Sequence, residues 1–204
     1  MFSYKKLNIL LTFLKKNYFK IIFTFILILA LFLRLYKINT SVWLQSGYDE
    51  SRDMLVASHI LQGELVNRGP LAAGGLNWLK NSALYYYFVA FIWFFTRDPI
   101  SFMYVWALIM TTPVVVAYCI GEKISGKRTG LILASLFALN FQMVYSSREL
   151  LQPHLLLLFS LGFIFSGISY LKEKTPSLKY VLWMIFFILI PLHFHYGVLI
   201  SLPI

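Results

Sequence analysis

Long uncharged apolar segments alternate with short charged connectors along the chain. Leu, Ile, Phe and Val dominate five stretches without charge, which lie between Lys20 and Arg34, Asp98 and Glu122, Arg128 and Arg148, Glu149 and Lys172, and from Tyr180 to the end. With its flanks, each stretch approaches the ~20 residues that a helix needs to cross a bilayer. The segments are too long and too continuously apolar for barrel strands, and a backbone in lipid must satisfy its own hydrogen bonds. The sequence therefore predicts an all-α, polytopic transmembrane helix bundle.

Composition excludes a water-soluble globule and gives the charge a topological meaning. Of 204 residues 59% are hydrophobic and 13% are charged, whereas about a quarter of an ordinary soluble domain is charged. The net charge is +10, and the basic residues lie at the ends of the apolar segments. This placement indicates membrane topology and argues against a nucleic-acid partner. The single cysteine, Cys119, excludes an intrachain disulfide and a cysteine metal cluster.

The distribution of Lys and Arg predicts the orientation. Five lysines before the first apolar run place the N-terminus in the cytoplasm, and residues 18–38 then form an uncleaved signal anchor. Residues 81–96 carry no charge and are rich in Tyr and Phe, so they form either a short span or an interfacial helix. If they do not cross, eleven of the 18 Lys and Arg lie inside; if they cross, two basic connectors move outside. We therefore expect five spans, a juxtamembrane helix, and an outer loop over residues 39–98.

An acidic cluster in the outer loop is the first candidate for chemistry. Asp49, Glu50 and Asp53 open an imperfect helical stripe that ends near Gly63, a residue suited to a helix C-cap. Carboxylates at a helix N-terminus are also favoured by the helix dipole without any catalytic role. Six of the eight acidic residues fall on the outer face in this topology, so a reaction site would face outward.

Polar residues inside apolar runs are the second group of candidates. Arg148 and His154 either end two spans or contact an anionic headgroup on the outer face. His193 and His195 follow Pro191 within the last apolar run, and residues two apart do not share a helix face, which argues against a two-histidine metal site. A polar residue within a span is costly and usually functional, so we expect His193 to face a substrate. Phosphate-loop, HExxH, GxSxG and CxxC motifs do not occur.

Several short motifs follow one another in a recognisable order. They are Arg34-Leu35-Tyr36, Tyr48-Asp49-Glu50, Ser51-Arg52-Asp53-Met54-Leu55-Val56-Ala57, Gly74-Gly75-Leu76, Ala83-Leu84-Tyr85-Tyr86-Tyr87, Tyr145-Ser146-Ser147-Arg148, Gln152-Pro153 and Leu192-His193-Phe194. This order resembles the amino-terminal half of the C-type (GT-C) membrane glycosyltransferases, which include protein O-mannosyltransferases and the lipid A aminoarabinose transferase. The chain departs from the family pattern at Ala83, where a proline is expected, at Gln152, where an asparagine is expected, and by an extra serine before Arg148.

The resemblance implies a glycosyl transfer at the outer face of the plasma (inner) membrane. The donor would be a polyprenyl-phosphate-linked sugar among membrane lipids, and the acceptor a lipid, a glycan or a protein. Asp49, with Glu50 beside it, would act in catalysis as general base. The remaining substrate-binding candidates are Arg52, Asp53, Arg68, Lys80, Tyr85, Arg148, His154 and His193, with Arg148 favoured as the phosphate clamp. The resemblance leaves a divalent cation at Glu50 and Asp53 open and predicts no defined metal site.

Two other interpretations stay open at the level of sequence. A non-enzymatic polyprenyl-lipid carrier or transporter also needs intramembrane histidines and outward-facing charges, and in a scaffold subunit Asp49 would only cap a helix. Members of the family usually have about twice as many spans. We therefore expect residues 1–204 to form a single domain that is the N-terminal part of a longer chain. This part would be inactive alone if the rest of the donor cavity is formed by later residues.

Overall fold

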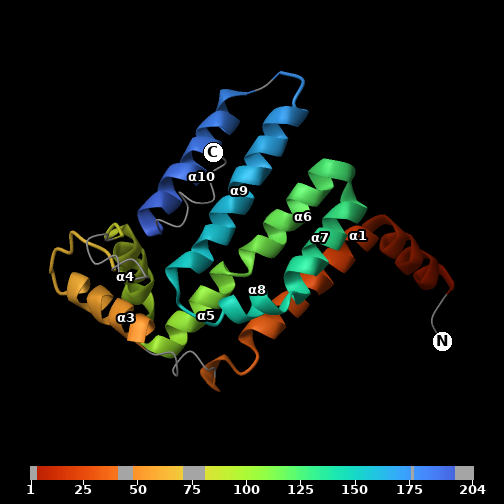
Figure 1. Ribbon diagram of the computed structural model, residues 1–204. Helices are drawn as coiled ribbons and strands as arrows, with labels where there is room; N and C mark the ends of the chain where they lie inside the picture. Colours follow the sequence, from red (N-terminus) through yellow and green to blue (C-terminus); the bar gives the residue numbers. More distant parts are fainter. Residues whose placement is uncertain (1–3, 41–47, 71–80, 176, 196–204) are drawn as a thin grey trace.

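The computed structural model describes residues 4–40, 48–70, 81–175 and 177–195, and this part of the chain is helical without a strand (Figure 1). Its elements are α1 (Tyr4–Leu35), the 3-10 helix η1 (Ile38–Thr40), α3 (Tyr48–Leu61), α4 (Leu84–Thr96), α5 (Pro99–Ile109), α6 (Thr112–Ser125), α7 (Lys127–Leu139), α8 (Phe141–Ser146), α9 (Gln152–Lys172) and α10 (Leu178–Phe194). The predicted all-α class is confirmed.

Three helical stretches within the described residues are long and apolar enough to cross a membrane: Leu14–Thr40, Pro99–Ser125 and Gln152–Lys172. The membrane character inferred from sequence is thereby supported, while the count of five spans stays a prediction. The expected span between Arg128 and Arg148 is divided into α7 and α8 at Asn140. This residue leaves the helical conformation at φ −61° and ψ 122°, and its side chain accepts a hydrogen bond from the Met143 amide at 3.0 Å, which starts α8.

The basic connectors gather at one end of the bundle. Lys172, at the end of α9, donates a hydrogen bond from Nζ to the Ile124 carbonyl near the end of α6 at 2.6 Å. Lys127, at the start of α7, lies 5.8 Å from the centre of the Phe19 ring in the first half of α1. The early part of α1, the α6–α7 connector and the α9–α10 connector therefore share this end (Figure 1).

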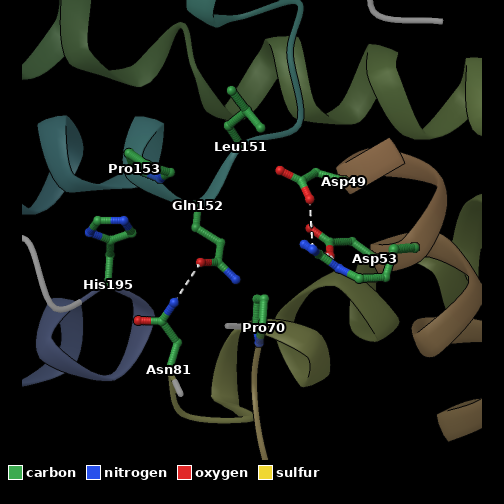
Figure 2. A pocket seen from close by; sticks show the side chains of 9 residues that line it. Asp49, Asp53, Pro70, Asn81, Leu151, Gln152, Pro153 and His195 are labelled. Carbon is green, nitrogen blue, oxygen red and sulfur yellow. Dashed lines mark hydrogen bonds and ion pairs between the residues drawn. The ribbon is translucent and has the colours of Figure 1, made fainter. Parts of the chain in front are cut away.

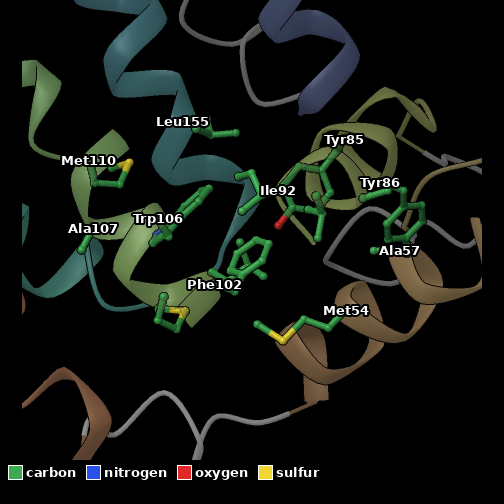
Figure 3. Close-up of a cluster of buried hydrophobic side chains, with 14 of the residues drawn as sticks. Met54, Ala57, Tyr85, Tyr86, Ile92, Phe102, Trp106, Ala107, Met110 and Leu155 are labelled. Atoms are coloured by element: carbon green, nitrogen blue, oxygen red, sulfur yellow. The ribbon is translucent and has the colours of Figure 1, made fainter. Parts of the chain in front are cut away.

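The opposite end holds α3, α4 and a large apolar core. α3 packs against α4, η1 packs against α5, and α10 reaches α4. Tyr85, Phe102 and Trp106 are fully buried there beside Met54 and Leu155 (Figure 3). The end of α1 and the start of α5 therefore lie at the same end of the bundle.

Two arginines join the helices at this opposite end. Arg34 of α1 is buried and donates to the Phe137 and Ala138 carbonyls at the end of α7, at 3.0 and 3.3 Å, and to its own Ala30 carbonyl at 3.1 Å. Arg148 donates to the Leu33 carbonyl at 3.1 Å and also to the Tyr36 carbonyl. The last carbonyls of a helix lack partners within the helix, so cationic donors there stabilise both helix ends.

Glycines allow the hairpin of α6 and α7 to close. A Cβ at Gly121 would lie 2.7 Å from the Thr129 carbonyl oxygen, and one at Gly130 would lie 2.8 Å from the Tyr118 carbonyl oxygen. Ala30, Ala134 and Ala138 bring α1 against α7 in the same way. Small residues permit this close approach where lipid gives no hydrophobic drive between helices. The large apolar side chains left outside on these helices, available for lipid contact, include Phe25, Ile28, Phe32, Ile132 and Leu136.

Candidate functional site

A cavity of about 390 Å³, with charged and carboxamide side chains in its lining, opens at the end of the bundle opposite the basic connectors. Figure 2 shows the side chains that line it. Its lining residues are Asp49, Arg52, Asp53, Pro70, Asn81, Leu151, Gln152, Pro153 and His195. They come from the first turns of α3, the segment before α4, the start of α9 and the end of α10. Segments far apart in the sequence therefore meet at one site.

The first turn of α3 supplies the charged wall. Arg52 donates from Nη1 to Asp49 Oδ1 at 2.6 Å, and from Nη2 and Nε to Asp53 Oδ1 at 2.7 and 2.9 Å. The Asp49 side chain is 52% exposed, whereas that of Asp53 is 2% exposed. One guanidinium thus links an accessible carboxylate to a buried one. α3 runs as the acidic stripe predicts, and Gly63 follows it with a φ of 97°.

Burial governs the ionisation of Asp53. Desolvation raises its pKa from 3.8 to about 6, against the opposing effect of the Arg52 charge and its hydrogen bonds. Tyr85, from α4, also favours the ionised form of Asp53, although its buried hydroxyl makes no hydrogen bond of normal length and angle. Burial raises the pKa of Tyr85 as well, and the Asp53 charge adds to this. The buried Asp53 carboxylate, with Tyr85 beside it, therefore holds the Arg52 guanidinium in place.

Two carboxamides make the neutral wall. Asn81 donates from Nδ2 to Gln152 Oε1 at 3.3 Å, which links the segment before α4 to the first residue of α9. The Asn81 backbone is fixed by a hydrogen bond from the Gly69 amide at 2.8 Å and by one to the Pro70 carbonyl at 3.0 Å. A Cβ at Gly69 would overlap the Ser82 carbonyl oxygen. Only glycine therefore allows the backbone at residue 69 to approach the backbone at residues 81–82 this closely.

The histidine at the cavity is not the one expected. His193 is exposed on α10, whereas His195, where α10 ends in an extended conformation, lines the cavity. The two rings thus face different ways, as their spacing of two residues predicts. The pattern could not decide which of them faces the site.

The other predicted site residues that the structure describes lie outside the cavity lining. Arg148 is occupied at the end of α1, and His154 lies near Glu149, with Nε2 3.9 Å from the carboxylate. Glu50 is buried and Arg68 is exposed. Lys80 and the Gly74-Gly75-Leu76 motif lie outside the described residues.

A divalent cation finds no defined site in the described part of the chain. No group of three or more His, Cys, Asp or Glu side chains is placed there to hold a metal ion. Of the two carboxylates considered from the sequence, Asp53 lines the cavity and Glu50 does not, so the two do not present a shared binding site to a ligand in the cavity.

Three polar lining residues were not among the predicted site residues: Asn81, Gln152 and His195. Gln152 stood out in the sequence only as a departure from the family pattern, and Asn81 carried no signal because a lone asparagine before an aromatic run is common in loops. Comparison of the chain with protein-family models, with curated proteins and with solved structures gives no match.

Proposed function

We propose that this protein transfers a glycosyl group from a polyprenyl-phosphate-linked sugar to an acceptor hydroxyl, with Asp49 as the general base. The observation that carries the proposal is the cavity itself. It brings together the acidic motif and the Gln152-Pro153 motif, on both of which the resemblance to C-type glycosyltransferases rests, and adds His195 from the end of the last apolar helix. Polar groups convergent in a concave site are the usual form of a binding site for a small ligand.

The different exposure of the two carboxylates supports different roles for them. Asp49 is accessible from the cavity and is held by a single contact to Arg52 Nη1. Asp53 is buried and accepts two hydrogen bonds from the same guanidinium. A general base must come within hydrogen-bond reach of the proton that it removes. The exposure of Asp49 leaves it open to an acceptor hydroxyl in the cavity, whereas the buried Asp53 would orient Arg52.

The step is a single displacement with inversion. The acceptor oxygen forms a bond to the anomeric carbon as the bond from that carbon to the phosphate oxygen breaks. Asp49 takes the proton of the acceptor hydroxyl, and the electron pair of the broken bond leaves with the polyprenyl phosphate. The product is the glycosylated acceptor, so no further reactant is needed.

Arg52 is the cation that the described lining offers to the departing phosphate. A guanidinium presents five donors in a rigid fork and suits phosphate oxygens. Two carboxylates already share it, so the phosphate would compete with Asp49 for Nη1. Arg148, expected to be the clamp, is committed to the end of α1, and we assign it a structural role.

The arrangement of the bundle supports an outward-facing site. The lysine-rich connectors share the end opposite the cavity, and the positive-inside rule assigns that end to the cytoplasm. The cavity then lies at the outer face of the plasma membrane, where α4 lies along the interface. The apolar helices α9 and α10 lead from the membrane to the lining residues (Figures 1 and 2), as a lipid-linked donor requires.

The proposal is tested by transfer of labelled sugar from polyprenyl-phosphate donors in membranes that express the intact reading frame. Asp49→Asn should lower the rate by at least about a hundredfold, the usual effect of removing a general base. Glu64→Gln is the matched control, because Glu64 is an exposed carboxylate of the same region that lies outside the cavity lining. It should leave the rate unchanged.

Equal rates in the wild type and Asp49→Asn, at equal expression, would exclude Asp49 as the base. No transfer by the wild type with any donor would favour the lipid carrier instead. Loss of activity in Glu64→Gln as well would show that the assay responds to the charge of the region and not to the chemistry of Asp49.

A further inference from the structure

The carboxamide of Gln152 has an unused donor at the cavity. The residue is 7% exposed, and its Oε1 accepts the hydrogen bond from Asn81. Its Nε2 is buried and has no hydrogen-bond partner in the described part of the chain. Figure 2 shows this nitrogen directed away from Asn81, toward the space between Pro70 and Asp53. A buried donor without a partner destabilises the folded state, so an acceptor supplied by a ligand would remove a penalty that folding leaves in place.

The carboxamide pair is rigid enough to select a ligand. The Asn81 backbone is held on both sides by Gly69 and Pro70. Gln152 begins α9, and Pro153, which follows it, favours the helical start with its fixed φ. Neither amide can turn to a new partner without breaking the bond between them. Pre-organised polar groups of this kind give a site its orientation and specificity.

The chemistry of the lining favours a neutral, oxygen-rich ligand. Asp49 and Asp53, when ionised, exceed the single charge of Arg52 by one, so the wall is not electropositive. An inorganic anion would have to displace Asp49 from Arg52, as the donor phosphate would, whereas a polyol donates to carboxylates and accepts from amides without such a displacement. An ammonium group only donates, so it would find no acceptor at Nε2.

We propose that the Asn81–Gln152 pair is the sugar-recognition subsite of the cavity, with Gln152 Nε2 donating to a hydroxyl oxygen of the transferred ring. The inference rests on the proposed function and adds the class of sugar: one with a hydroxyl, not an amino group, at the position that faces Gln152. Gln152 is a specificity-determining residue, and Asp49 on the opposite wall acts on the acceptor.

The test measures sugar binding by saturation-transfer NMR on the full chain in lipid nanodiscs. The probes are the methyl glycosides of glucose, galactose and mannose, their amino-deoxy analogues, and inorganic phosphate. The variants are Gln152→Met, which removes the donor at similar volume, and Gln152→Glu, which keeps the acceptor for Asn81. Ser169→Ala is the matched control, because Ser169 is also buried on α9 with a hydroxyl that lacks a partner, at the far end of the helix.

The wild type and Ser169→Ala should bind at least one neutral glycoside, and Gln152→Met should bind it about five- to tenfold more weakly, the effect of one neutral hydrogen bond. Gln152→Glu should gain binding of an amino-deoxy analogue. No glycoside binding by the wild type, equal binding by Gln152→Met, or binding of phosphate alone that depends on Gln152 would overturn the inference.

Transfer activity, measured on the same samples, separates this inference from the proposed function. If the wild type transfers sugar and Gln152→Met does so with unchanged donor preference, the subsite is wrong and the transferase stands. If glycosides bind through Gln152 but no donor is turned over, the subsite stands and the proposed reaction fails.

Discussion

Asp53 gives the prediction that the structure supports most directly, because a carboxylate at 2% exposure should make stability depend on pH. Its pKa is raised by burial from 3.8 to about 6. Each pKa unit corresponds to about 1.36 kcal/mol of free energy, so the difference between the folded and unfolded pKa values corresponds to about 3 kcal/mol. Asp53→Asn keeps the size of the side chain and resembles the protonated acid at every pH.

The sign follows from the direction of the pKa shift. Because the folded state holds the Asp53 proton more tightly, its stabilising effect is complete below pH 3.8 and is lost as the pH rises through about 6. The free energy of unfolding of the wild type should therefore fall relative to Asp53→Asn by about 3 kcal/mol between about pH 4 and pH 7. Equilibrium unfolding of both proteins in mixed micelles across this range measures the difference.

Asp98→Asn provides a control of opposite sign. Asp98 is exposed at the start of α5, and hydrogen bonds to Ser101 and Ile100 lower its pKa. Its stabilising effect is present above the unfolded pKa and is lost as the pH falls through the folded one, and Asn keeps the cap without the charge. A difference between wild type and Asp53→Asn that stays constant from pH 4 to pH 7 would refute the reasoning for Asp53.

Two substitutions test how the helices are held together. Arg34→Lys cannot reproduce the hydrogen bonds to Phe137 and Ala138, and should lower the free energy of unfolding by about 2–4 kcal/mol in the same mixed micelles, since buried carbonyls lose a charged donor; an unchanged value would mean that α7 ends without this contact. Gly130→Val should lower it by about 1–3 kcal/mol, because its Cβ would lie 2.8 Å from the Tyr118 carbonyl. Gly167→Ala, whose Cβ would only touch Met184 at 3.7 Å, should change it little, and an equal loss in both glycine variants would contradict the argument from close approach.

Local patterns along the chain were sufficient for the helical class, for the apolar membrane segments and for the acidic first turn of α3. These features follow from neighbouring residues: the length of an apolar run sets its ability to cross lipid, and carboxylates favour a helix start. Asn140 is a local signal that the length of the apolar run hides. A residue type that favours N-caps stood inside an expected span, and the helix breaks there to start α8.

Only the tertiary structure decided which polar residues share the cavity. Spacing shows that His193 and His195 face different ways, but the packing of α10 against α4 and α9 selects His195. Arg148 is drawn to the unpaired carbonyls of α1, more than a hundred residues away in the chain. The contact of Asn81 with Gln152 likewise joins positions 71 residues apart. Such pairings depend on how whole helices pack, which short-range periodicity does not encode. Local sequence therefore determined the candidate residues, and tertiary packing determined which of them lie together at the cavity.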